Sequence, residues 1–145
     1  MFRHILIPTD GSATSRNAIQ QSIALAKGCG ANVVGLYVIP EFHMFTYQTE
    51  MLEDTREKFE KDGFAHAKKY LAEIEVAAKE AGVRCETLYV NGDSPYEEII
   101  KVAHDKRCDL IAMASHGRKG VKGLLLGSET QKVLTHSAIP VLVFR

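Results

Sequence analysis

Residues 2–12 read FRHILIPTDGS, an apolar run closed by a proline and followed by turn-forming residues. The aliphatic residues Ile5, Leu6 and Ile7 favour a buried strand, whereas the cluster Thr-Asp-Gly-Ser contains residue types that begin helices. The segment therefore predicts a strand that ends at Pro8 and leads through a short turn into a helix.

The same order of apolar run and helical pattern recurs along the chain. Further apolar runs cover residues 32–39, 83–90, 109–114 and 139–144, and each predicts a strand. Apolar residues also step by three and four through the middle of the chain, which predicts a long amphipathic helix whose solvated face includes the charged stretch 50–61. Its expected inner positions are Phe64, Ala67, Leu71, Ile74 and Ala78.

Two short segments carry the pattern of a capping box at the start of a helix. Residues 94–97 read SPYE and residues 128–131 read SETQ. In such a box the serine side chain accepts from a backbone amide of the first turn, and the acidic or amide side chain bonds back to the serine. We therefore expect helices to begin at these points.

Strict alternation of apolar strands with helices predicts an α/β protein. The fold expected is an open, five-stranded parallel sheet with helices on both faces, Rossmann-like, in a single domain covering residues 1–145. Ligands of such sheets bind beyond the carboxyl ends of the strands, where the winding direction reverses. Candidate site residues are thus sought at strand ends.

Composition excludes several classes of protein. Eighteen basic residues balance eighteen acidic ones, so there is no basic footprint for nucleic acid or an anionic membrane. No apolar stretch approaches the roughly 20 residues that span a bilayer, and the first residues lack the features of a signal peptide, which predicts a cytoplasmic protein. The three cysteines and six histidines show no spacing typical of a disulfide framework or a transition-metal site.

Two strand ends carry candidate chemistry. Asp10 follows the first strand, where its carboxylate could accept from ribose hydroxyls or hold Mg²⁺, or could simply cap a helix. Residues 113–128 read MASHGRKGVKGLLLGS, in which glycines permit close backbone approach and a helix N-terminus offers amides to phosphate oxygens. Arg118, Lys119 or Lys122 could add a positive charge. His116, beside the expected phosphates, could be a general acid or base, but a histidine in a polar loop is more often a solvated or hydrogen-bonding group.

This second segment resembles the nucleotide motif of the universal stress protein family. Gly117, nine residues and then Gly127-Ser128 are similar to the later part of G-x-x-G-x9-G-[S/T]. PTDGS at residues 8–12, GDSP at residues 92–95 and IPVLV at residues 139–143 also match, so the likeness covers essentially the whole chain. Ala114 departs from the motif, because the family has a glycine there.

The resemblance implies sheet order 3-2-1-4-5, with ATP, ADP or AMP, with or without Mg²⁺, lying across the ends of strands 1 and 4. It implies a homodimer formed through the last strand, and Asp10 on the ribose or metal side of the ligand. Val38 and Met113 would flank the adenine. The full set of residues expected at the nucleotide is Pro8, Thr9, Asp10, Val38, Met113, Ala114, His116, Gly117, Arg118, Gly127, Ser128 and Glu129.

Three functions remain open from the sequence. The first is a dimeric stress-response or regulatory protein that binds ATP. The second is an enzyme that slowly hydrolyses ATP through Asp10, metal and water, although the chain lacks a P-loop and an evident nucleophile with its base. The third is a nucleotide-free dimeric interaction module, which Ala114 favours.

Overall fold

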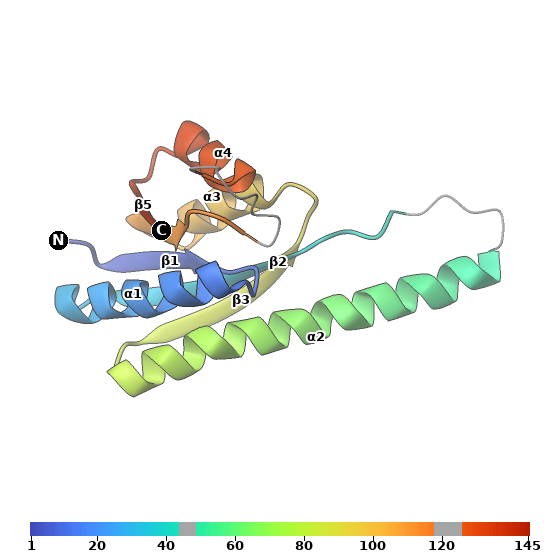
Figure 1. The fold of residues 1–145 in the computed structure, drawn as a ribbon, viewed down its shortest axis with the longest axis horizontal. Coiled ribbons are helices and arrows are strands. Elements are labelled where there is room, and N and C mark those ends of the chain that lie inside the picture. Colours follow the sequence, from blue (N-terminus) through green and yellow to red (C-terminus); the bar gives the residue numbers. More distant parts are fainter. Residues whose placement is uncertain (44–48, 118–125) are drawn as a thin grey trace.

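The structure is a computed structural model, and it describes residues 1–43, 49–117 and 126–145. Its centre is a five-stranded, all-parallel sheet with strand order β3-β2-β1-β4-β5 (Figure 1). The strands are β1 (His4–Pro8), β2 (Asn32–Ile39), β3 (Cys85–Asn91), β4 (Leu110–Ala114) and β5 (Val141–Phe144). The predicted fold class and strand order are confirmed.

Helices cover both faces of the sheet, as predicted. The helices are α1 (Ala13–Cys29), α2 (Thr49–Ala81), α3 (Pro95–Asp105) and α4 (Ser128–His136). In Figure 1, α1 and α2 lie on one face, and α3 and α4 lie on the other. Each face has its own hydrophobic cluster, because successive residues of a strand point to opposite faces.

The central strand β1 is buried on both faces of the sheet. Ile5, Leu6 and Ile7 have no exposed surface, and Ile5 and Ile7 pack in the α1 and α2 cluster while Leu6 packs in the opposite one. Burial on both faces explains why this strand is a continuous aliphatic run. Because β1 is the middle strand of the sheet, the residues after Pro8 lie at the middle of the edge where the strands end.

The long helix α2 confirms one expectation and corrects another. Ala67, Leu71 and Ile74 are buried against the sheet as predicted. Phe64 is 52% exposed instead, and its ring meets that of Tyr89 edge-on, with centroids 5.5 Å apart. Tyr89 belongs to β3, an edge strand of the sheet, and is itself 45% exposed, so Phe64 packs at the margin of the sheet and not in the core.

Neither expected capping box forms. Ser94 makes no side-chain cap bond, and the amide of Tyr96 instead donates to the Glu129 carboxylate of α4 at 2.9 Å. The N-cap of α4 is Gly127, so Ser128 is the first helical residue. A carboxylate from a neighbouring helix satisfies α3, a contact that local sequence does not reveal.

Two strands begin two residues later than predicted. The amide of Val83 donates to the carbonyl of Ala78, which ends α2, so β3 begins only at Cys85. Pro140 has no amide to donate, and its carbonyl accepts from Ile111 just before β5. Within the described ranges, the helices are too polar or too short to cross a membrane.

Candidate functional site

The turn after β1 holds the carboxylate of Asp10 in a fixed orientation. Its Oδ1 accepts from the amide of Ser12 at 2.9 Å and from the hydroxyl of Ser15 at 2.8 Å. Ser12, not Asp10, is the N-cap of α1, because its hydroxyl accepts from the amide of Ser15 at 3.1 Å. One carboxylate oxygen of Asp10 is thus engaged by its own turn.

Pro8 and Thr9 shape this turn. Pro8 is the last residue of β1 and pairs with Leu36 of β2. The buried Thr9 donates its amide to the carbonyl of Leu36 at 2.9 Å, and its hydroxyl accepts from the amide of Gly11 at 3.2 Å. Both residues therefore position Asp10 through backbone and turn contacts.

The end of β4 lies beside this turn. Ala114 is the last residue of the strand, and Arg107 is the one described non-glycine residue with a positive φ. The methyl group of Ala114 therefore adds no backbone strain, which removes the conformational objection to alanine at this motif position. The carbonyl of Ala114 accepts from the hydroxyl of Thr130 at 2.9 Å, which ties β4 to α4.

Asp10 and Gly117 meet across the ends of β1 and β4. A Cβ atom on Gly117 would lie closer than 3.0 Å to Oδ2 of Asp10, nearer than real Cβ atoms approach. Any side chain at this position would force the carboxylate or the backbone to shift, and this constraint is steric, since the φ of Gly117 is not positive. Two of the predicted ligand residues, from segments about a hundred positions apart, are thus in contact.

The N-terminus of α4 lies next to Gly117 and completes the group of candidate site residues at this edge of the sheet. The amide of Gly127 donates to the carbonyl of Ser115 at 2.6 Å, and a Cβ on Gly127 would lie 3.3 Å from that oxygen. The amides of Ser128 and Glu129 open the helix and donate to no acceptor within the described ranges. Among the described residues, the amides of Ser128 and Glu129 therefore have no acceptor, whereas the amide of Gly127 is already in use.

Glu129 contributes its backbone rather than its side chain. Its carboxylate accepts from the amide of Tyr96 at 2.9 Å and lies 3.4 Å from the ammonium of Lys132. These partners hold the negative charge at the start of α3. The carboxylate is thereby kept from opposing an anion at the amides of α4.

The two residues expected at the adenine share one hydrophobic cluster. Met113 of β4 is 7% exposed, and the partly buried Val38 of β2 packs against the same cluster, on the α3 and α4 face of the sheet. Both lie at or next to the carboxyl end of their strands. They offer apolar surface beside the polar group formed by Asp10, Gly117 and α4.

His116 is half-buried, and its Nδ1 lies 2.9 Å from the hydroxyl of Ser115. Arg118 lies outside the described residues, as does most of the glycine-rich loop. Its predicted role stays a prediction.

Three hydroxyl residues were missed by sequence reasoning. Ser15 donates to Asp10, Ser115 accepts from Gly127 through its carbonyl, and Thr130 donates to Ala114. Ser115 and Thr130 lie within the segments already singled out, yet their partners become visible only in three dimensions. Ser15 lies in the first turn of α1, five positions after Asp10, and could have been suspected from that spacing.

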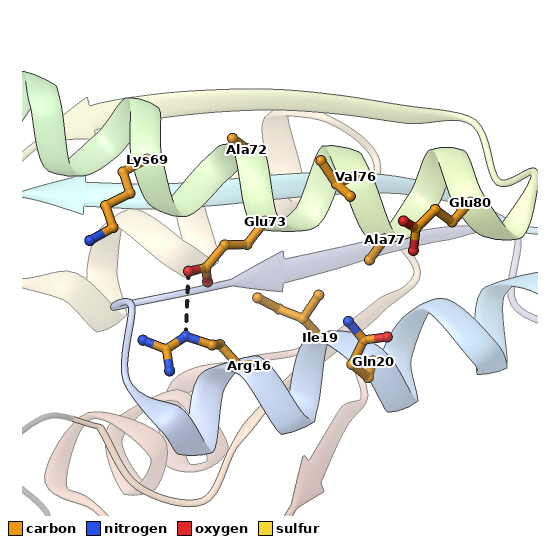
Figure 2. Close-up of a pocket in the computed structure, with 9 residues that line it drawn as sticks. All are labelled: Arg16, Ile19, Gln20, Lys69, Ala72, Glu73, Val76, Ala77 and Glu80. Carbon is orange, nitrogen blue, oxygen red and sulfur yellow. Dashed lines mark hydrogen bonds and ion pairs between the residues drawn. The ribbon is translucent and has the colours of Figure 1, made fainter.

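A separate groove lies on the α1 and α2 face of the sheet, opposite the cluster that contains Met113 and Val38. It has a volume of about 430 Å³ and lies between α1 and α2 (Figure 2). Figure 2 shows Arg16 facing Glu73 across it, with Nε and Oε1 3.4 Å apart. None of the predicted nucleotide residues lines this groove.

Comparison with known proteins gives a consistent result. A family model described as "Universal stress protein family" matches residues 1–145. Universal stress protein YxiE of Bacillus subtilis is 35% identical, with all of both chains covered.

Two solved structures have the same fold. That of protein MJ0577, from Methanocaldococcus jannaschii, has a TM-score of 0.83 at 33% identity, over 99% of this chain and 95% of that one. A universal stress protein in complex with cAMP has a TM-score of 0.73 at 25% identity, over 99% of this chain and 97% of that one.

Proposed function

Because the chain belongs to the universal stress protein family, we propose that it binds an adenine nucleotide, with ATP as its ligand, and acts as a homodimeric regulatory protein of the cytoplasm rather than as an enzyme. The solved relative in complex with cAMP supports an adenine nucleotide as the ligand class. The observation that carries the proposal is the contact between Asp10 and Gly117 beside the open amides of α4.

The amides of Ser128 and Glu129 are the groups proposed to bind phosphate oxygens. They sit at the positive end of the α4 dipole, where backbone N–H groups have no intrahelical partner. Gly117 and Gly127 leave room for phosphate because each lacks a Cβ that would meet neighbouring polar atoms. Ala114 has no positive φ, so the departure from the family motif adds no backbone strain.

The charge of Asp10 calls for a cation between it and the phosphates. A carboxylate facing a triphosphate is repulsive, and Mg²⁺ bound by carboxylate and phosphate oxygens removes that repulsion. Asp10 is the residue that would hold the ion. Its Oδ1 is fixed by Ser12 and Ser15, so the carboxylate is oriented before the ion binds.

The binding test compares Asp10→Asn with the unchanged protein in equilibrium dialysis against ATP. Asparagine keeps the shape and one acceptor oxygen but removes the charge. We expect the ATP affinity of the variant to fall at least about tenfold in Mg²⁺ and to change little in EDTA. Absence of any affinity for ATP, ADP or AMP up to about 1 mM would overturn the proposal.

The proposed dimer forms through β5. Among the described residues this strand pairs with β4 alone, and it carries Leu142, which is 37% exposed. An edge strand presents unpaired backbone groups that a second copy of the strand can satisfy. In light scattering we expect a dimer for the unchanged protein and for Val76→Lys, a control on exposed α2 surface, but a monomer for Leu142→Lys.

One observation favours a nucleotide-free interaction module instead. The amide of Gly127 already donates to the carbonyl of Ser115, so in the structure it is not available to a phosphate oxygen. In that case Gly117→Val and Gly127→Val leave partner binding unchanged. The nucleotide proposal predicts that both substitutions abolish ATP binding.

Slow hydrolysis is tested in the same samples. The proposal predicts no steady release of phosphate from ATP. Turnover that Asp10→Ala removes while ATP binding is retained would favour the enzyme.

A further inference from the structure

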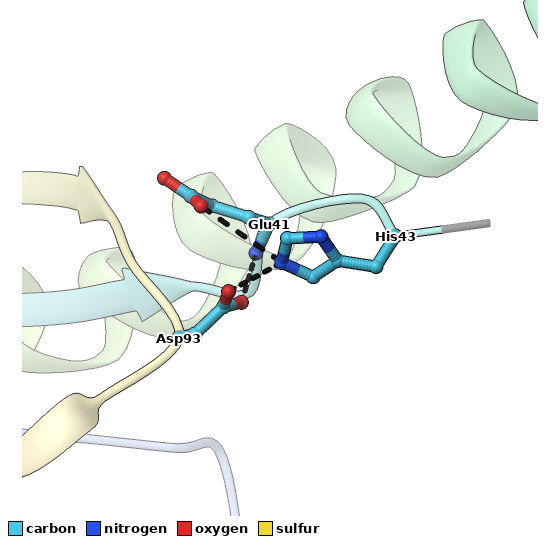
Figure 3. A group of neighbouring side chains, drawn as sticks. All are labelled: Glu41, His43 and Asp93. Atoms are coloured by element: carbon cyan, nitrogen blue, oxygen red, sulfur yellow. Dashed lines mark hydrogen bonds and ion pairs between the residues drawn. The ribbon is translucent and has the colours of Figure 1, made fainter. Parts of the chain in front are cut away.

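Three metal-ligating side chains converge where β2 and β3 end. Glu41 and His43 follow β2, and Asp93 follows β3, 50 positions along the chain from His43. Figure 3 shows the ring of His43 pointing toward the carboxylate of Asp93, with the carboxylate of Glu41 beside them. All three are exposed, and one ligand atom from each lies within 4.8 Å of the other two.

The three ligand atoms are close enough together to reach one metal ion. Nε2 of His43 is in direct contact with Oδ2 of Asp93 and lies 3.9 Å from Oε2 of Glu41. A tetrahedral ion with bonds of about 2.1 Å needs ligand atoms about 3.4 Å apart. One separation is shorter than this and the other is longer, so small side-chain rotations would place all three around one ion.

Backbone contacts hold the ligands in place. Ile39 pairs with Asn91, and the amide of Gly92 donates to the carbonyl of Ile39 at 2.9 Å, which fastens the two strand ends together. The amide of Glu41 then donates to Oδ1 of Asp93 at 3.2 Å. This bond orients the Asp93 carboxylate and leaves Oδ2 on the side of His43.

Phe42 fixes the segment that carries the other two ligands. Its ring packs against Phe59 of α2, with centroids 5.4 Å apart, and the guanidinium of Arg56 lies 5.7 Å from its centroid. The residue between Glu41 and His43 is thus anchored on α2, while its two neighbours turn toward Asp93. The arrangement combines contacts from β2, β3 and α2.

We propose that Glu41, His43 and Asp93 form a binding site for a divalent transition-metal ion, Zn²⁺ in particular. Surface carboxylates alone bind hard cations through oxygen, whereas an imidazole nitrogen that converges with two carboxylate oxygens matches the ligand types of zinc sites. Three protein ligands leave a fourth position for water or an external ligand. The site does not depend on the proposed nucleotide, and it shares no ligand with the Asp10 group.

The test is calorimetric titration of the full chain with ZnCl₂, without nucleotide, in a non-chelating buffer. We expect one site per chain with a dissociation constant below about 0.1 mM. His43→Ala and Asp93→Asn should each weaken binding at least about tenfold. His104→Ala is the matched control, because this exposed histidine on α3 lies outside the group. The Zn²⁺ affinity of this variant should equal that of the unchanged protein.

Two further measurements make the result decisive. Circular dichroism is used to check the fold of each variant, and we expect all of them to be folded because the substituted side chains are exposed. Co²⁺ titration distinguishes the ligand types, since thiolate ligands give an intense near-ultraviolet charge-transfer band and this site should give none. The proposal is overturned by weaker binding than stated, by an affinity that survives both substitutions, by equal loss in His104→Ala, or by a thiolate band.

Discussion

Substitution of Gly117 by alanine tests the contact at the centre of the candidate site. The new methyl group would lie closer than 3.0 Å to Oδ2 of Asp10. Gly117 does not have a positive φ, so alanine adds no backbone strain and the effect is purely steric. Either the Asp10 carboxylate rotates away or the backbone of residue 117 moves.

The size of the effect follows from the bonds that hold Asp10. Rotation of the carboxylate weakens the bonds that Oδ1 accepts from Ser12 and Ser15. Hydrogen bonds to a charged group contribute about 1.5–3 kcal/mol each, and partial loss of one predicts a decrease of about 1–2 kcal/mol in the free energy of unfolding. Displacement of either the carboxylate or residue 117 predicts at least a tenfold loss of ATP affinity, about 1.4 kcal/mol.

The assay combines urea denaturation with ATP binding measured in Mg²⁺. Gly28→Ala is the matched control, because a Cβ at Gly28 meets no atom within 4 Å and Gly28 lies in helix α1. We expect this control to bind ATP normally and to be stabilised by up to about 1 kcal/mol.

A double variant isolates the steric contact. In an Asp10→Ala background the carboxylate is gone, so Gly117→Ala should destabilise the protein much less than it does alone. A folded Gly117→Ala protein with unchanged ATP affinity would refute the reasoning. So would equal destabilisation in both backgrounds.

Three other predictions concern stability and reactivity. Gly11 has φ +81° and a Cβ there would collide with the ring of Tyr70, so Gly11→Ala should lower the free energy of unfolding by at least about 2 kcal/mol, and an unchanged urea midpoint would contradict this. Burial alone would raise the pKa of Asp109, but hydrogen bonds from the backbone amides of residues 3 and 4 outweigh it and lower the pKa. Its stabilisation is therefore complete above the unfolded pKa of about 3.9 and is lost as the pH falls through the folded pKa, so urea midpoints of Asp109→Asn and the unchanged protein should differ at pH 7, and the difference should shrink as the pH falls below about 3.9. Burial raises the pKa of the Cys85 and Cys108 thiols from 9.0 to about 11, so alkylation at pH 8, followed by mass spectrometry, should be about a hundredfold slower than for a thiol of pKa 9.0; similar rates would contradict it.

The sequence predicted the architecture because the strands are buried on both faces. Ile5, Leu6 and Ile7 form a continuous apolar run for that reason, and each such run alternates with a helical pattern. Helix starts were predicted less well. Ser94 and Ser128 have the residue types of a cap, but Glu129 and Gly127 take those roles through contacts made by the folded chain.

Strand ends and glycines in the sequence predicted only part of the candidate site. Asp10 and Gly117 could be assigned to one edge of the sheet because parallel strands end on the same side. The bond between Gly127 and Ser115 could not, since it depends on how the loop returns to β4. The group of Glu41, His43 and Asp93 was missed because no ligand spacing along the chain joins β2 to β3.

Titration of ¹⁵N-labelled protein with ATP and Mg²⁺, followed by amide chemical shifts, tests nucleotide binding most directly. The largest changes are predicted at Gly117, Ser128 and Glu129, with the groove between α1 and α2 unaffected at Ala72 and Ala77. Unchanged shifts at the start of α4, with or without changes in that groove, would contradict a nucleotide site at the ends of β1 and β4.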